Sequence, residues 1–127
     1  MLLPDYLAEI TAVIAEYSKT GLIISSDVNV DSRTEKLGLI RGTLVFIDYS
    51  TLFITEYVDV RYKIEKLTYA YHYQDKENSL IFRYDNAVHK PELDFIEHKH
   101  TGEKTISAGV PEIADILEEI LLRIRQI

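Results

Sequence analysis

The sequence of 127 residues contains no cysteine. This excludes disulfide bonds, thiolate catalysis and cysteine-ligated zinc, and it favours a reducing cytoplasm. No apolar run approaches the roughly 20 residues that a membrane-spanning helix needs. The N-terminus, MLLPDYLAEI, lacks the basic region of a secretory signal and is expected to form an amphipathic helix. We therefore expect a soluble, cytoplasmic protein that does not associate with a membrane.

Basic charge is also scarce, since the formal net charge is -7. General affinity for nucleic acid comes mostly from Lys and Arg neutralising phosphates, so this balance argues against it. Between Arg83 and Lys104, however, four bases stand against five acids, and a local site for an anionic ligand stays possible there. Nucleophile motifs, glycine-rich phosphate loops and helix-turn-helix signals are missing.

The composition is that of a globular domain, with 46% hydrophobic and 28% charged residues. The length fits one domain, residues 1–127, and there are no repeats, low-complexity tracts or linkers. Apolar residues from Leu3 to Tyr17 recur at helical spacing, with Pro4 in the first turn and Gly21 at the end. A second apolar stripe, from Ile113 to Ile127, follows Pro111 and predicts a C-terminal helix.

Between the helices the hydrophobic period changes to 2, which is typical of strands. In the first strand Ile24, Val28 and Val30 share the apolar face. Short polar turns join consecutive strands and favour a meander. The sequence thus predicts an α+β two-layer sandwich, an antiparallel meander sheet of about five strands with the N-terminal and C-terminal helices on one face. The predicted strands are Leu22–Val30, Glu35–Ile47, Thr51–Arg61, Thr68–Gln74 and Ser79–Asp85.

The last two predicted strands can be aligned by their aromatic residues. A turn over residues 75–78 would pair Tyr73 with Leu80, Tyr71 with Phe82 and Tyr69 with Tyr84, which makes one face aromatic and suited to helix packing. The opposite face would carry Thr68, His72, Arg83 and Asp85. Glu56, in the preceding strand, is interpreted as an edge or end-of-strand carboxylate.

All four histidines lie between His72 and His100, and three of them, His89, His98 and His100, fall after Asn86 in a segment that we expect to be an irregular loop. Long loops in small domains are often functional. If the segment is extended, His98 and His100 project to one side. With His89, and with or without Asp85, they could ligate zinc, manganese or nickel. The alternative is that these imidazoles are simply solvated.

A second hypothesis requires no metal. RNA cleavage by the internal 2′-hydroxyl needs a base, an acid and a cation for the phosphorane, and histidine, with an ordinary pKa of about 6.5, suits both proton transfers. His72, Arg83 and the loop histidines supply these parts, and Arg83 or Lys99 could hold the phosphate. The alternative is an ordinary polar sheet face in which Asp85 pairs with Arg83.

Three stretches carry a family resemblance: YHYQD from Tyr71, LIFRYDNAVHKPEL from Leu80, and HKH from His98. The chain resembles the TumE family of small prokaryotic toxin-antitoxin toxins, whose members typically carry YHWQD, RWDNAPHHPEL and HHKH. The matching block covers about a quarter of the chain. This sequence departs from the pattern in that Tyr73 and Tyr84 replace Trp, Val88 replaces Pro and Lys90 replaces the second His of a pair. A mechanism that needs two adjacent histidines would therefore have only His89.

The resemblance implies a growth-inhibiting toxin that is neutralised by a small antitoxin, commonly a helix-turn-helix protein, and a ribonuclease activity is the reasonable inference. RNA is then the expected substrate. No cofactor is expected, although a divalent metal is possible. We assign the candidate residues by role: His89, His98 and His100 to proton transfer or metal ligation, Arg83 and Lys99 to phosphate, and His72 and Asp85 to orientation.

The competing hypothesis is a binding module that sequesters a protein partner through its exposed sheet face without turnover. A sequence pI near 5.0 fits this class better than an RNA-binding enzyme. An exposed edge strand, such as the first, could also pair two copies into a homodimer.

Overall fold

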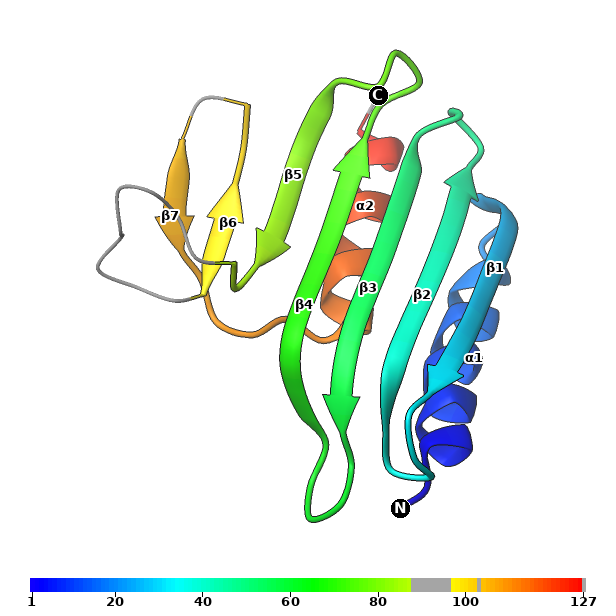
Figure 1. The fold of residues 1–127 in the computed structure, drawn as a ribbon. Helices are drawn as coiled ribbons and strands as arrows, with labels where there is room; N and C mark the ends of the chain where they lie inside the picture. The colour runs from blue at the N-terminus through cyan, green and yellow to red at the C-terminus, as the bar shows by residue number, and fades with distance from the viewer. Residues whose placement is uncertain (88–96, 103, 127) are drawn as a thin grey trace.

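The computed structural model describes residues 1–87, 97–102 and 104–126. Over these residues the chain forms one antiparallel sheet of seven strands in sequence order, flanked by two helices. Figure 1 shows both helices on the same side of the sheet, so the other face is open. This confirms the predicted two-layer α+β architecture. The elements are α1 (Leu3–Ser18), β1 (Ile23–Ser32), β2 (Leu37–Phe46), β3 (Thr51–Asp59), β4 (Glu65–Gln74), β5 (Leu80–Asp85), β6 (His98–His100), β7 (Thr105–Ser107) and α2 (Ile113–Arg125).

The sheet has two more strands than predicted. The five predicted strands correspond to β1 to β5, whereas β6 and β7 come from the segment that we expected to be irregular. Each has three residues, too few to show a period of 2, and the turn between them includes Gly102. β1 and β7 are the outer strands. Pairing of two copies through β1 stays a prediction.

The register of β4 and β5 differs from the prediction by two residues. Tyr71 lies opposite Tyr84, and Tyr73 lies opposite Phe82, because the pairing is irregular between Tyr73 and Gln74. A shift of two preserves the side on which each residue lies. Accordingly Tyr69, Tyr71 and Tyr73 are buried beneath the helices, as the alternation predicted.

A second irregularity alters the start of β1. The pairing with β2 shifts between Ile23 and Ser25, so Ile23 packs against the core while Ile24 is 51% exposed. The prediction for Ile24 was wrong, because a bulge exchanges the faces of the residues on one side of it. Val28 and Val30 do pack against the core as expected.

Glu56 is not an edge carboxylate. It lies in the middle of β3, is 1% exposed, and faces the helices. Its carboxylate accepts hydrogen bonds from the Tyr6 hydroxyl on α1, at 2.5 Å, and from the Tyr71 hydroxyl on β4. Burial, together with the Glu56 charge, raises the pKa of both tyrosines well above the ordinary value.

The cation of this buried cluster is Lys66 on β4, whose Nζ lies 3.7 Å from Glu56 Oε2. The same Nζ donates to the Tyr71 hydroxyl and to the carbonyl of Pro111, both at 2.7 Å. Pro111 is two residues before α2, so Lys66 links the sheet to the start of that helix.

None of the helices in the described residues is long and apolar enough to cross a membrane.

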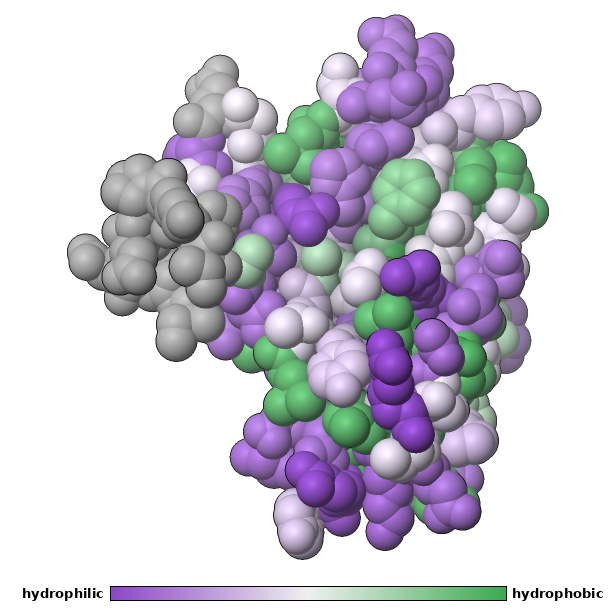
Figure 2. Space-filling view, viewed as in Figure 1, coloured by the Kyte–Doolittle hydropathy of each residue, from purple (hydrophilic) through white to green (hydrophobic). Residues whose placement is uncertain are grey.

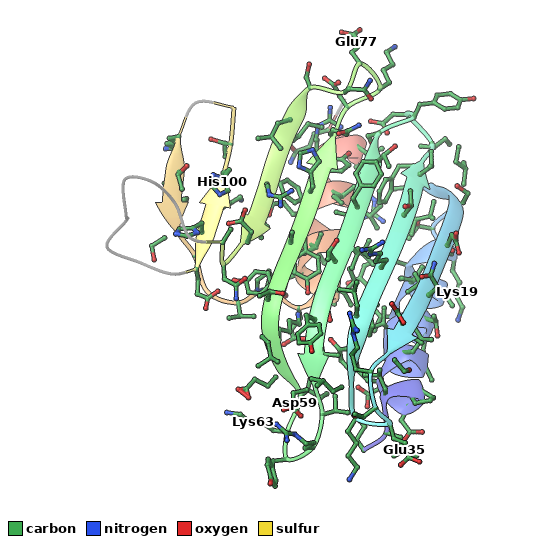
Figure 3. The ribbon with its side chains drawn as sticks, viewed as in Figure 1. Lys19, Glu35, Asp59, Lys63, Glu77 and His100 are labelled. Atoms are coloured by element: carbon green, nitrogen blue, oxygen red, sulfur yellow. The ribbon has the colours of Figure 1, made fainter. Side chains whose placement is uncertain are left out.

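Replacing Lys66 by methionine should therefore destabilise the fold. A buried carboxylate that loses its cation typically costs about 3–5 kcal/mol. We expect a loss of this size in the free energy of unfolding, measured by urea denaturation, and partial recovery in the Lys66→Met/Glu56→Gln double variant. The control is Lys63→Met, since Lys63 lies exposed in the loop between β3 and β4 (Figure 3). Equal stability of both single variants would contradict this role of Lys66.

Candidate functional site

One cross-strand row on the open face holds three of the candidate residues. His72 on β4 pairs with Arg83 on β5, and Arg83 pairs with His100 on β6. In the next row Asp85 pairs with His98. Side chains alternate along a strand, and since the tyrosines occupy the helix side, these five residues project from the open face. Figure 3 shows His100 on β6, the neighbour of β5.

Asp85 is the centre of this group. Its Oδ2 accepts a hydrogen bond from Arg83 Nε at 2.9 Å, and its Oδ1 lies 3.3 Å from His98 Nδ1 and 3.2 Å from His100 Nε2. Asp85 is 3% exposed. Burial raises the pKa of its carboxyl, but the hydrogen bonds from Arg83 and the two histidines outweigh burial and hold the pKa below the ordinary value. Asp85 is therefore a charged acceptor that orients its three neighbours.

The partners of His72 define its protonation state. Arg83 Nη1 can only donate, so His72 Nδ1, at 3.2 Å, is the acceptor. The proton is thereby assigned to Nε2, which donates to Gln74 Oε1 at 3.1 Å. Burial and the nearby Arg83 charge lower the pKa of His72 below its ordinary value. His72 is thus a neutral imidazole whose basic nitrogen faces a guanidinium.

Exposure divides the group into two kinds of residue. Asp85 and His98 are buried, at 3% and 2%, whereas Arg83, His72 and His100 are half-buried. Of these five side chains, the half-buried ones have the surface that a ligand can contact. His100 Nδ1 also lies 2.9 Å from the Thr105 hydroxyl on β7. The arrangement thus offers one guanidinium and two imidazoles to a ligand, and Asp85 is bonded to the guanidinium and to the His100 imidazole.

Two candidates do not join this group in the structure. Lys99 pairs with Tyr84 on the helix side of the sheet, and its Nζ donates to Glu119 on α2 at 2.8 Å. The sheet therefore separates Lys99 from Arg83, and the two cannot hold one phosphate in this geometry. His89 lies outside the described residues.

The same side chains have donor atoms suited to a metal ion. Asp85, His98 and His100 each offer one ligand atom, and the three atoms lie within 4.8 Å of one another. Nitrogen and oxygen donors in this number match catalytic zinc sites, which keep a further position open. Of the predicted set His89, His98 and His100, the last two are brought together.

Two supporting residues were missed by the sequence analysis. Gln74 was seen only as a strand end, although its position two residues after His72 places both on one face. Thr105 belongs to β7, which was read as part of a loop. The stretch HKHTGEKTIS, two short extended runs around a glycine-containing turn, was the available signal for a hairpin.

The fold and the site define a small two-layer α+β protein with a histidine, arginine and aspartate cluster on an open sheet face. Residues 10–127 match the family model described as Toxin TumE. The chain belongs to this family, whose members are toxins of toxin-antitoxin systems with a cognate antitoxin as partner, and the resemblance in the central block is confirmed. Neither a curated protein nor a solved structure gives a match.

The pKa of His72 gives a direct test of the site geometry. In an NMR titration we expect the His72 imidazole to titrate below the ordinary 6.5, and Arg83→Met to raise its midpoint, because a cation beside the ring is removed. Lys76→Met, which removes an exposed charge from the β4–β5 turn, should leave the midpoint unchanged. A His72 midpoint that does not respond to Arg83 would contradict the contact.

The sign of the linked effect on stability follows from the same shift. As the pH falls below 6.5, His72 takes up its proton in the unfolded chain before it does so in the folded chain, so acidification destabilises the fold. The contribution of His72 to the free energy of unfolding is therefore fully present only above pH 6.5. Its contribution falls as the pH drops through the lowered folded pKa.

Proposed function

We propose that this toxin cleaves RNA by internal transfer of the phosphate to the 2′-hydroxyl, with His72 and His100 acting on either side of Arg83. The observation that supports the proposal is the cross-strand row itself. A base, an acid and a phosphate-binding cation are the three groups that this reaction needs, and the row contains two imidazoles with a guanidinium between them.

Arg83 is proposed to bind the scissile phosphate. Its Nε and Nη1 are held by Asp85 and His72, while Nη2 makes no hydrogen bond to any described residue. The Arg83 side chain is 37% exposed, so this nitrogen can reach a ligand on the open face. Held by Asp85 through Nε, the guanidinium keeps its position when Nη1 exchanges His72 for a phosphate oxygen, and it stabilises the charge that develops on the phosphorane oxygens.

The two proton transfers of the proposed reaction are assigned to one imidazole each. His72 Nδ1 takes the proton of the 2′-hydroxyl once Arg83 Nη1 has turned to the phosphate, and the 2′-oxygen forms a bond to phosphorus. The bond from phosphorus to the 5′-oxygen breaks, and protonated His100 donates the proton on Nδ1, the nitrogen not bonded to Asp85, to that oxygen in place of its contact with the Thr105 hydroxyl. The products are a 2′,3′-cyclic phosphate and a 5′-hydroxyl.

Asp85 and His98 are proposed as positioning residues. Asp85 Oδ1 faces both His98 and His100, so its negative charge compensates the positive charge of a protonated His100 and fixes the ring plane. His98 is too buried to meet substrate, and its Nδ1 lies 3.3 Å from Asp85 Oδ1, where it helps to orient the carboxylate.

The test is incubation of the purified toxin with total RNA. We expect cleavage that leaves 2′,3′-cyclic phosphate ends, and a loss of about 100-fold or more in His72→Ala and in His100→Ala, since positioned acid–base groups contribute about 10²–10⁴-fold. Arg83→Ala should lose a similar factor, and Lys76→Ala should retain full activity. A synthetic RNA with a single 2′-deoxy substitution should resist cleavage at that position. Full activity of His100→Ala, or ends that carry a 3′-hydroxyl, would exclude this mechanism.

A metal-dependent variant of the same site is the second candidate, favoured by the spacing of Asp85, His98 and His100. Under the acid–base mechanism, EDTA should leave cleavage unchanged. If EDTA abolishes cleavage and Zn²⁺ or Mn²⁺ restores it, an ion held by these three residues supplies the chemistry. Calorimetric titration with Zn²⁺, in the parent protein and in His98→Ala, then tests whether His98 is a ligand.

Intact RNA in every reaction would support the alternative of a non-catalytic binding module. The net charge of -7 favours that alternative. Salt distinguishes the two classes, because phosphate recognition weakens steeply as salt rises and an apolar protein interface does not. For the antitoxin we propose a small helix-turn-helix protein, and a cytoplasmic location stays a prediction.

A further inference from the structure

We infer that the open face carries a track for single-stranded RNA that runs across the strands, with one base stacked on Phe53 and a second phosphate bound by Arg41. This inference rests on the proposed function and specifies the substrate: an unpaired strand whose scissile phosphate lies at Arg83.

Phe53 extends the cross-strand row by one strand. It lies on β3 directly opposite His72, with ring centroids 6.2 Å apart, and is 40% exposed. β3 is an inner strand of the sheet, and its helix side is occupied by neighbours such as Leu52 and Ile54, so the Phe53 ring lies on the open face. A flat apolar ring beside the imidazole of a reacting centre is a surface on which a nucleobase can stack.

Arg41 supplies a second cation next to Phe53. It lies on β2, where it pairs with Thr55, while its neighbour on the same face, Thr43, pairs with Phe53. Arg41 and Phe53 are therefore diagonal neighbours, whose separation is typically about 7–8 Å. Arg41 is exposed, and within residues 1–87, 97–102 and 104–126 its guanidinium makes no hydrogen bond or ion pair.

The dimensions of the track suit a short single strand. Neighbouring strands lie about 4.8 Å apart, so β2 to β5 span about 14 Å. Four-stranded sheets of RNA-binding domains, which have the same width, seat two or three stacked bases on exposed aromatic side chains. Bases in a duplex are stacked on each other and cannot lie flat on a sheet, which selects unpaired RNA.

Acidic residues limit the track at β1. Asp27 pairs with Thr43, and Asp31 pairs with Leu39, so both carboxylates flank β2 on the open face. Both are diagonal neighbours of Arg41, whose direct partner is Asn29, so a phosphate at Arg41 competes with them for the guanidinium and no phosphate site extends beyond it. Figure 2 shows this face as a mixture of hydrophilic and hydrophobic residues, without the broad apolar patch that marks many protein interfaces.

Binding can be measured separately from cleavage in the His100→Ala background. The probe is a fluorescein-labelled single-stranded RNA of mixed sequence, followed by fluorescence anisotropy. Adding Phe53→Ala should weaken binding about 5- to 150-fold, the usual effect of losing one base stack. Phe53→Tyr should restore it, because the ring is retained. Tyr62→Ala, which removes a 95% exposed aromatic ring from the β3–β4 loop, is the matched control and should bind as the parent does.

Arg41 is tested by salt dependence. Arg41→Ala should reduce the slope of log K against log salt by about 0.7, the value for one phosphate of a single strand, and Arg41→Lys should preserve the slope. Arg125→Ala, which removes an exposed charge from α2, is the control. A duplex of the same sequence should bind more weakly than the single strand. Thermal unfolding of each variant verifies that the fold is intact.

The outcomes separate this inference from the proposed reaction. RNA binding that depends on Phe53 and Arg41, without any cleavage by the parent toxin, would retain the track and exclude the reaction. Cleavage by the parent toxin, together with RNA binding that neither substitution weakens, would overturn the track and leave the proposed reaction standing. If the two substitutions weaken antitoxin binding but not RNA binding, or if no single strand binds, the face is not an RNA surface and the inference fails.

Discussion

The register between β4 and β5 is the constraint on which both the core and the candidate site depend. Tyr71 faces Tyr84 beneath the helices, and the next pair along the strands, His72 and Arg83, faces the other way. A slip of one residue would expose the buried tyrosines and bury the arginine. Each buried aromatic ring removes roughly 150–250 Å² from water, at about 25 cal/mol per Å², so the core stabilises the register by several kcal/mol. The polar side chains of the site are held in place by packing on the opposite side of the sheet.

Alternation in the sequence was sufficient to place His72, Arg83 and Asp85 on one face. The predicted register was wrong by two residues, but a shift of two leaves every side chain on the same side of the sheet. Alternation could not give the register itself. The irregular pairing after Tyr73 is tied to the following turn, where Asn78 has a positive φ of 67° and Asp75 Oδ1 accepts backbone hydrogen bonds from Glu77 and Ser79. Such local geometry has no periodic signal.

The position of His98 and His100 could not be predicted for a different reason. Strands of three residues show no period, so the sequence suggested a loop cluster rather than an added hairpin. As part of β6, these histidines are brought to Asp85 by backbone pairing, and Lys99 between them is turned to Glu119 on the helix side. His98 and His100 therefore lie on the open face and Lys99 on the helix face, although the three basic residues are adjacent in the sequence. A count of charge along the sequence cannot separate them.

This separation bears on the departure from the family pattern, in which Lys90 stands where the family has the second histidine of a pair. A mechanism that needed two adjacent histidines would be incomplete in this chain. In the proposed mechanism the two imidazoles are His72 and His100, which are distant in sequence but lie on the two strands beside Arg83. Their separation is fixed by the spacing of the sheet, about 4.8 Å per strand. Acid–base chemistry on this face depends on strand order and register, so substitutions that disturb the β4–β5 pairing should impair it as strongly as the loss of a histidine.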